Sequence, residues 1–304
     1  MLSILIPVYN FPCTDLVTEL QRQATGCAVP FEIILMDDCS TLYKEENRKL
    51  SELTLVKWIE LTENIGRAKI RNRLADKAKF DRLLFMDNDV RPTNENYVKN
   101  YLEVCSDYQV ICGGRTYAKN PPQNKNLYFH WLVGTKREVF SVDERRKNPN
   151  KSFMTNNFLI HKNVFNTVRF DENISTYGHE DTLFGFELKK RGIEIHHIDN
   201  PLKHIGLEPA ERILAKEKEG IENLYAVILK HRYAKEIAED ITLLKYDRLA
   251  KKLHITTVLA YFYRRFQNTI EQNLTGEKPS LCLFDFYKSG YLSLLAQMNK
   301  KQGH

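Results

Sequence analysis

The segment Leu83-Leu84-Phe85-Met86-Asp87-Asn88-Asp89-Val90 is the most informative in the chain, because an apolar run leads directly into two carboxylates one residue apart. The run is typical of a buried strand in a parallel sheet. Open α/β sheets bind ligands at the carboxyl ends of their strands, so we expect Asp87 and Asp89 at a ligand-binding edge. A divalent cation carrying a phosphorylated ligand would relieve the repulsion between the two carboxylates. The alternative is a solvated Asp-Asn-Asp turn.

The chain around this segment alternates between strand-like and helix-like patterns. Buried strands that alternate with helices predict a mostly parallel, doubly wound α/β sheet flanked by helices. Polar residues follow two further strands directly, at Tyr9 and at Asp37-Asp38. We expect strands at 2–8, 31–36, 54–61, 82–86, 108–112, 158–160 and 193–198, and helices at 15–23, 43–52, 93–106 and 182–191.

The remaining segments set the domain organisation. Helical spacing replaces strand alternation after about residue 208 and continues to about 273, which predicts a helical extension over 208–304. Gly113-Gly114 predicts a close backbone approach at the end of a strand. Residues 141–151 are polar, charged and interrupted by proline, and we expect a mobile lid or loop there.

Composition excludes several classes of protein. The chain has 304 residues, a net charge of +6 and six cysteines without a metal-binding spacing, which suits one large domain with an appendage in a reducing compartment. A protein that binds nucleic acid would need a basic stripe, whereas acids follow the predicted strands of this chain. The N-terminus does not resemble a signal peptide, and no run approaches the ~18 to 20 apolar residues of a membrane span. We therefore expect a cytoplasmic protein.

Taken together, the polar motifs at the predicted strand ends resemble those of the inverting family 2 glycosyltransferases of the GT-A fold. The resemblance covers about residues 2–206 and implies a GT-A catalytic domain at 1–207, with a nucleotide-binding half (1–112) and an acceptor-binding half (113–207). The matching segments are Ser3-Ile4-Leu5-Ile6-Pro7-Val8-Tyr9-Asn10, Glu32-Ile33-Ile34-Leu35-Met36-Asp37-Asp38-Cys39-Ser40, Asn64-Ile65-Gly66-Arg67-Ala68 with Arg71-Asn72, Asp87-Asn88-Asp89 and Gly178-His179-Glu180-Asp181.

The resemblance implies a site for a nucleotide-sugar donor, of which a UDP-sugar fits best. Tyr9 offers a ring for stacking on the base, Asp38 accepts a hydrogen bond from it, and Asp37 steadies the loop. Arg71 lies near the diphosphate. The implied donor-binding residues are Pro7, Tyr9, Asp37, Asp38, Asn64, Gly66, Arg71 and Asn88.

A metal site and a catalytic base follow from the same resemblance. Asp87, Asp89 and His204 would hold Mn²⁺ or Mg²⁺, which neutralises charge on the departing diphosphate. Asp181 would accept the proton of the attacking acceptor hydroxyl, and Glu180 would bond the acceptor or adjacent backbone. The alternatives are helix capping for the acidic pair and an ordinary surface or core position for His204.

Three further features are open. The family usually has glycine after the acidic pair, where this chain has Cys39. Trp131 and residues 134–138 resemble the segment that such enzymes fold over the donor and acceptor, although Trp131 could equally lie in the core. Basic and aromatic residues cluster at 251–252 and 261–266, which favours either contact with an anionic membrane or packing against the catalytic domain or a second copy in a homodimer.

The sequence thus predicts an inverting glycosyltransferase that transfers a sugar from a nucleotide-sugar to a glycan or lipid-linked acceptor. Cell-surface polysaccharide biosynthesis at the inner face of a membrane is the expected setting. The alternatives are a sugar-nucleotide nucleotidyltransferase, and a nucleotide- or carbohydrate-binding module without turnover. A nucleotidyltransferase usually has a Gly-rich basic loop after its first strand, where this chain has Val8-Tyr9-Asn10-Phe11-Pro12.

Overall fold

The structure is a computed structural model that describes residues 1–174, 177–226 and 228–302. It divides into two compact units. The sheet unit comprises the described residues of Met1–Lys119, Arg137–Ser175 and Glu180–Gly206, and the helical unit those of Asn120–Lys136, Thr176–His179 and Leu207–His304. The domain boundary at 207/208 remains a proposal, since the segment Asn120–Lys136 also joins the helical unit.

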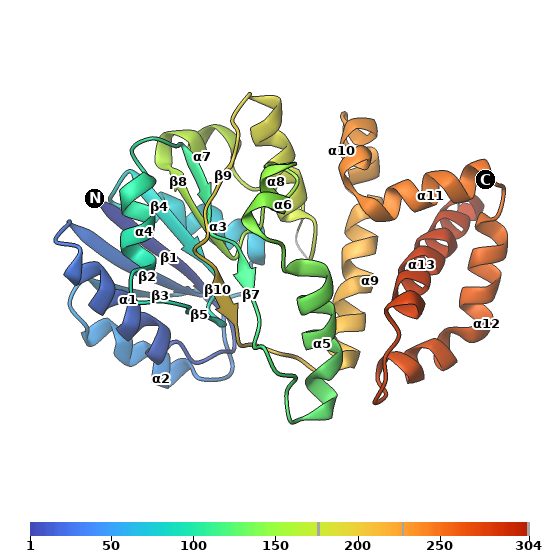
Figure 1. The fold of residues 1–304 in the computed structure, drawn as a ribbon, viewed down its shortest axis with the longest axis horizontal. Coiled ribbons are helices and arrows are strands. Elements are labelled where there is room, and N and C mark those ends of the chain that lie inside the picture. Colours follow the sequence, from blue (N-terminus) through green and yellow to red (C-terminus); the bar gives the residue numbers. More distant parts are fainter. Residues whose placement is uncertain (175–176, 227, 303–304) are drawn as a thin grey trace. The chain divides into compact units, whose positions relative to one another are not determined.

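A seven-stranded sheet forms the centre of the sheet unit, in the order β3-β2-β1-β4-β8-β6-β9 (Figure 1). All neighbouring strands are parallel except that β8 runs antiparallel to both β4 and β6. The carboxyl ends of β1, β2 and β4 therefore lie at one edge. The strands are β1 (Leu2–Val8), β2 (Phe31–Asp37), β3 (Val56–Glu60), β4 (Arg82–Met86), β6 (Val110–Cys112), β8 (Asn157–His161) and β9 (His196–His197).

Apolar layers cover both faces of this sheet. Because successive side chains of a strand point to opposite faces, Ile4 belongs to the apolar cluster on one face and Leu5 to the cluster on the other. Helical spacing buries Leu16, Leu20 and Ala24 of α1 in the first cluster. The helices of this unit are α1 (Thr14–Gly26), α2 (Lys44–Arg48), the 3₁₀ turn η1 (Lys49–Glu52), α3 (Arg67–Lys77), α4 (Tyr97–Val104), α6 (Val142–Arg146), α7 (Lys162–Val168) and α8 (Glu180–Lys190).

A small second sheet carries part of the site. It has the order β5-β10-β7 and consists of β5 (Val90–Pro92), β7 (Arg115–Thr116) and β10 (Leu202–His204). β10 runs antiparallel to β5, with His204 opposite Val90. This pairing brings His204 beside the acidic segment that ends at Asp89.

The mostly parallel α/β sheet is confirmed, and so are the helical residues that follow it. The prediction of a loop over residues 141–151 is wrong in part, because α6 begins there. Ser141 and Glu144 form a reciprocal capping box at its start, a signal that the polar composition concealed. Arg145 is buried and donates hydrogen bonds to the carbonyls of Cys112 and Ile198.

The close approach predicted at Gly113-Gly114 is confirmed. Gly114 has φ +89°, and a Cβ there would stand 2.8 Å from the guanidinium carbon of Arg145. A Cβ on Gly113 would lie 2.4 Å from the carbonyl oxygen of Asn200. Neither position therefore has room for a side chain.

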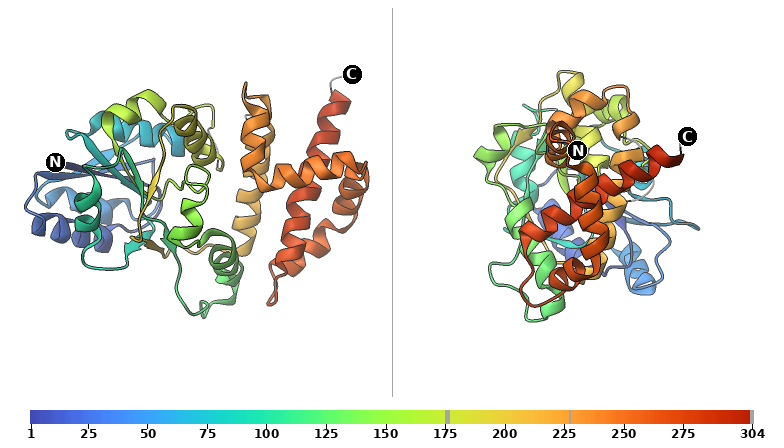
Figure 2. Two further views of the ribbon diagram at one scale, coloured as in Figure 1. Left: turned by 45° about the horizontal axis from the view of Figure 1, so that its top comes forward. Right: turned by 90° about the vertical axis from the view of Figure 1, so that its right-hand side faces the viewer.

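The helical unit has its own apolar core, which includes Phe129, Ile213, Leu274 and Phe284. α12 and α13 lie side by side, and the break predicted after residue 273 separates them (Figure 2). Among the described helices, none combines the length and apolar character needed to cross a membrane. The elements are η2 (Lys125–Leu127), α5 (Tyr128–Val133), η3 (Gly134–Glu138, a π-helical turn that continues into the sheet unit), α9 (Ala210–Ala226), η4 (Ile228–Lys230), α10 (Ala234–Asp240), α11 (Thr242–Lys252), α12 (Thr256–Leu274) and α13 (Leu281–Gln302).

Candidate functional site

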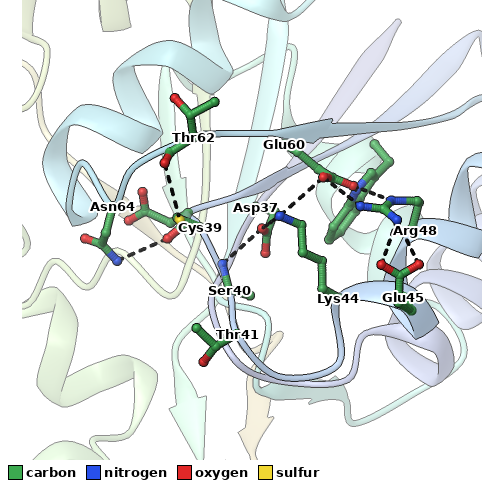
Figure 3. A network of polar contacts seen from close by, with 12 residues as sticks. Asp37, Cys39, Ser40, Thr41, Lys44, Glu45, Arg48, Glu60, Thr62 and Asn64 are labelled. Carbon is green, nitrogen blue, oxygen red and sulfur yellow. Dashed lines mark hydrogen bonds and ion pairs between the residues drawn. The ribbon is translucent and has the colours of Figure 1, made fainter.

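Asp37, at the end of β2, is fully buried and organises the loop that follows. Its Oδ2 accepts a hydrogen bond from the backbone N–H of Ser40 at 3.0 Å. Lys44 Nζ lies 4.0 Å from the same oxygen and 3.3 Å from Glu60, which also binds Arg48 (Figure 3). The charge of Asp37 is thus held inside the protein, and this residue can shape a ligand site without touching the ligand.

Asp38 holds the segment that leads into helix α3. Its two carboxylate oxygens accept hydrogen bonds from the backbone N–H groups of Ile65 at 2.7 Å and Gly66 at 3.1 Å. Asn64 donates to the backbone carbonyl of Asp38. Burial raises the pKa of the Asp38 carboxyl, and the two backbone hydrogen bonds lower it only in part. Two backbone N–H groups just before α3 therefore already bind a carboxylate.

Tyr9 and Pro7 occupy the end of β1 beside this loop. The Tyr9 side chain is 49% exposed, so its ring is accessible for stacking. Sequence reasoning missed Asn10, whose backbone is left-handed at φ +49°. Its Oδ1 accepts hydrogen bonds from the backbone N–H of Thr41 at 2.8 Å and of Leu42 at 2.9 Å. Asparagine tolerates this conformation, and here it joins the first two strand-end loops.

The substitution of cysteine for the usual glycine has a structural consequence. Cys39 adopts φ +61°, in the left-handed region that favours glycine. Its Sγ lies 3.6 Å from the carbonyl oxygen of Thr62. The loop thus keeps the backbone conformation that a glycine would adopt more easily.

Asp87 lies among three arginines. Its Oδ1 accepts a hydrogen bond from Arg71 at 2.6 Å, and its Oδ2 lies 3.5 Å from Arg67 and 3.7 Å from Arg115. Burial alone would raise the pKa of Asp87, but the three guanidinium groups hold it well below its ordinary value. Arg71 is itself only 1% exposed, so it acts on any ligand through the field of this cluster.

The sequence did not single out Arg67 or Arg115. Arg115 lies on β7 and also binds Glu138 at 2.5 Å, and Glu138 accepts a hydrogen bond from the Tyr117 hydroxyl at 2.6 Å. Burial, followed by the charge of Glu138, raises the pKa of Tyr117. Arg67 stood within a matching motif, but its partners come from distant segments and could not be inferred from local spacing.

Asp89 and His204 lie beside each other at one end of the second sheet. His204 Nδ1 lies 3.5 Å from Asp89 Oδ1, and the backbone N–H of Ile205 donates to the Asp89 carbonyl. Burial would raise the pKa of Asp89, but His204 shifts it below its ordinary value. Apart from His204, the buried Oδ1 of Asp89 has no hydrogen-bond partner among the described residues. A buried carboxylate oxygen with so few hydrogen bonds favours the prediction of a cation site over the alternative of a solvated turn.

Asp89 and His204 fit a divalent ion that takes its remaining ligands from other molecules. No group of three or more His, Cys, Asp or Glu side chains in the described part of the chain is arranged to hold a metal ion. Mg²⁺ characteristically binds one or two carboxylates and takes its remaining ligands from substrate phosphates and water. Asp89 with His204 provides such a partial shell, whereas the charge of Asp87 is met by arginine.

Asn88 lies between the two acids. It lines a cavity of about 280 Å³ with Phe11, Pro12 and Ile205. Its Nδ2 is buried and makes no hydrogen bond to the described residues. This amide therefore remains a candidate ligand contact.

The second acidic pair begins helix α8. Glu180 accepts a hydrogen bond from Arg67 Nε at 2.8 Å, and Arg71 lies 4.0 Å away. Burial would raise the pKa of Glu180, but the two arginines lower it. Burial, followed by repulsion from Glu180, raises the pKa of Asp181 to about 6. Of the two carboxylates, Asp181 therefore has the affinity for protons that a base at neutral pH needs.

Comparison with known proteins agrees with this geometry. The family model described as glycosyl transferase family 2 matches residues 3–169, more than half of the chain. The chain belongs to glycosyl transferase family 2. Comparison with curated protein sequences gives no significant match.

Solved structures of glycosyltransferases share the GT-A fold of this family 2 chain. TarS from S. aureus is 15% identical, with a TM-score of 0.53; the match covers 96% of this chain and 55% of TarS. The TarS fragment 1–349 in complex with UDP-GlcNAc is 15% identical over 100% of this chain and 92% of that one, with a TM-score of 0.52. The mannosyltransferase PcManGT from Pyrobaculum calidifontis, in complex with GDP-Man and Mn²⁺, is 11% identical over 97% and 86%, with a TM-score of 0.53.

One more residue of this glycosyltransferase has the character of a site residue. Asn156 is buried, and neither atom of its side-chain amide has a hydrogen bond within the described residues. Its carbonyl accepts a hydrogen bond from the N–H of Asp87. The neighbouring Asn157 instead binds the hydroxyls of Tyr97 and Tyr101. The two adjacent asparagines at the start of β8 were the sequence feature that could have pointed to a site residue. The sequence does not show which of them has its hydrogen bonds satisfied inside the protein.

The segment predicted to cover the substrates contains an unusual turn. Residues Gly134–Glu138 form a π-helical turn, a feature frequent at functional sites. Trp131 lies on α5 with its ring 5.6 Å from that of Tyr128. A role for Trp131 in sugar binding stays a prediction.

Proposed function

We propose that this glycosyltransferase acts with inversion and transfers a sugar from a UDP-sugar to a hydroxyl of a glycan or lipid-linked acceptor, in cell-surface polysaccharide biosynthesis. One observation carries the proposal. The guanidinium of Arg67 lies against both Glu180 and Asp87, so the two acidic motifs form one charged centre. Such a centre can place a departing diphosphate and an acceptor hydroxyl on opposite sides of a sugar.

The donor binds at the ends of β1 and β2 in this proposal. Tyr9 stacks on the base, with Pro7 beside it. Each oxygen of Asp38 accepts one backbone hydrogen bond and has a further lone pair, with which it accepts a hydrogen bond from the base. Asp37, Asn64 and Gly66 shape this loop through the hydrogen bonds described above. The UDP-GlcNAc in the TarS fragment and the GDP-Man in PcManGT support a nucleotide-sugar donor.

Asp89 and His204 would hold the divalent ion beside the donor diphosphate. The ion supplies charge neutralisation for the leaving nucleoside diphosphate. A nitrogen ligand beside a carboxylate suits Mn²⁺, the ion in the PcManGT complex, better than Mg²⁺. Asp87, predicted as a ligand, contributes by orienting Arg67, Arg71 and Arg115, because these cations already meet its charge.

Asp181 is the general base. Its carboxylate accepts the acceptor's proton as the hydroxyl oxygen attacks the anomeric carbon from the face opposite the diphosphate. A placed base of this kind contributes roughly 10² to 10⁴ in rate. Glu180 orients Arg67 through their ion pair, in place of the acceptor contact expected from sequence.

The rival functions have less support. A sugar-nucleotide nucleotidyltransferase would not explain membership of a glycosyl transferase family. A binding module without turnover would not need a carboxylate with a pKa of about 6 beside the donor centre. We place the enzyme in the cytoplasm, at the inner face of the membrane where lipid-linked acceptors are elongated.

Calorimetric titration with UDP, with and without Mn²⁺, tests the proposal. We expect Mn²⁺-dependent binding that Asp89→Ala abolishes and that Asp143→Ala, an exposed carboxylate on α6, leaves unchanged. Binding of GDP or dTDP in place of UDP would change the donor base but keep the reaction. If none of the three nucleotides binds with metal present, the proposed donor site is wrong.

A further inference from the structure

A series of exposed apolar side chains lies along α11, in the connection after it and along α12. We call these residues the apolar strip; each is between 39% and 64% exposed. They are Tyr246, Leu249, Leu253, Ile255, Val258, Tyr261, Phe262 and Phe266. Single exposed apolar residues are ordinary, but a run of this length marks an interaction surface.

The strip is separate from the face of α12 that forms the core. Ala260, Tyr263 and Ile270 are buried, and Tyr263 packs edge-on to Tyr287 of α13. Val258, Phe262 and Phe266 are spaced four residues apart, so they line up along another face of the helix. The rings of Phe262 and Phe266 stack at 6.0 Å. Packing within the helical unit therefore does not account for these side chains.

The strip is flanked by positive charge. Residues 242–269 carry six basic side chains and a single acidic one, Asp247, which pairs with Lys251 at 2.5 Å. Since the whole chain has a net charge of +6, the rest of the chain is close to neutral. The basic residues, all exposed, are Lys245, Arg248, Lys251, Lys252, Arg264 and Arg265.

We propose that the apolar strip and its basic flanks dock the helical unit on an anionic lipid bilayer. Aromatic and aliphatic side chains enter the boundary between headgroups and acyl chains, while Lys and Arg reach the phosphates through their flexible stems. A second copy of this chain is a poorer occupant. A two-fold interface places the same patch on both subunits, and this would bring two strongly positive strips together.

This inference extends the proposed function, because it places the enzyme where a lipid-linked acceptor would lie. The docking inference rests on the proposed function only for its biological setting. Vesicle binding needs neither donor nor acceptor, so its outcome is independent of the nucleotide titration.

Co-sedimentation with vesicles tests the docking surface. We expect the full chain to bind vesicles of phosphatidylcholine mixed with phosphatidylglycerol, and to bind vesicles of phosphatidylcholine alone at least about 10-fold more weakly. Arg264→Gln with Arg265→Gln should weaken binding to the anionic vesicles about 30-fold, because each basic side chain near the surface contributes about 1 kcal/mol. Tyr261→Ser with Phe262→Ser should weaken it about 10-fold or more.

Matched controls come from the same chain. Lys49→Gln with Lys57→Gln removes two exposed charges from the sheet unit, and Met298→Ser removes an exposed apolar side chain from α13. We expect both controls to bind vesicles like the wild type. Every variant should keep the wild-type circular dichroism spectrum and thermal unfolding transition, which shows that it is folded.

Two results would overturn the inference. One is equal binding to neutral and anionic vesicles, or no binding to either kind. The other is a dimer in sedimentation that Tyr261→Ser with Phe262→Ser converts to a monomer, since the strip would then be a subunit interface. A protein that binds vesicles but no nucleotide would contradict only the donor proposal.

Discussion

Gly206 lies directly against the carboxylate of Asp89, and a Cβ at this glycine would stand 2.5 Å from Asp89 Oδ2. The backbone N–H of Gly206 also points to the Asp89 carbonyl at 3.3 Å. The absence of a side chain at residue 206 therefore sets the position of the proposed metal ligand.

Gly206→Ala should displace the Asp89 carboxylate and weaken Mn²⁺-dependent UDP binding at least about 10-fold, because a contact under 3 Å must be relieved by movement. Titration with UDP in the presence of Mn²⁺ measures this effect. The control is Gly26→Ala at the end of α1, where a Cβ meets nothing within 4 Å. An alanine at 206 that leaves the affinity unchanged would contradict the constraint.

Replacement of Asp181 should lower the activity of the enzyme and raise its stability. Asp181→Asn should lower kcat roughly 10² to 10⁴-fold if Asp181 is the base. The pKa of Asp181 is about 6 in the folded protein and 3.8 in its ordinary state, so folding favours the protonated form. Stability is therefore lost as pH rises through this interval, and the variant should be more stable than wild type by about 3 kcal/mol at pH 8.

The same shift predicts the pH dependence of the wild type. We expect kcat/KM to fall below about pH 6 as Asp181 takes up a proton. At pH 4 the stability difference between wild type and Asp181→Asn should be much smaller than at pH 8. An acid limb of kcat/KM near pH 4, or full activity in the variant, would exclude Asp181 as the base.

Arg67 and Glu180 should show a strong coupling energy in the free energy of unfolding. Arg67→Met should destabilise the protein by about 2 kcal/mol, less than the loss expected for a fully buried pair because Arg67 is partly exposed. With Glu180→Gln it completes a double-mutant cycle, and denaturant unfolding should give a coupling of about 1 kcal/mol or more. The surface pair Arg191–Glu187 at the end of α8 should give only about 0.3 to 0.5 kcal/mol. Equal coupling in the two cycles would refute the charged centre.

Cys39→Gly should stabilise the protein slightly. A left-handed residue with a Cβ costs roughly 1 to 2 kcal/mol, and the extra freedom of glycine in the unfolded chain offsets about half of this, which leaves a gain of about 0.5 kcal/mol. Cys39→Ala keeps the Cβ and should bring no gain. Cys27, with φ −81°, is the control position, where glycine should destabilise. Unfolding in urea measures all three.

The central sheet and its binding edge could be predicted because their signals are local. Apolar runs such as residues 2–8 and 83–86 and the acids that follow them are properties of short segments, and parallel pairing then places Tyr9, Asp38 and Asp89 at one edge. Helix α6 was missed although its capping box is also local, because the composition of residues 141–151 outweighed a two-residue signal.

The charges of the site depend on contacts between distant segments. Arg67, Arg115 and Glu180 come from three separate elements, and no periodicity indicates that they converge on one charged centre with Asp87. Burial depends on the same convergence, and for this reason it is the tertiary structure that raises the pKa of Asp181 and lowers that of Glu180. Residue types alone defined the family and the edge of the sheet; packing decided which carboxylate is neutralised by arginine, which faces His204 and which retains the affinity for a proton.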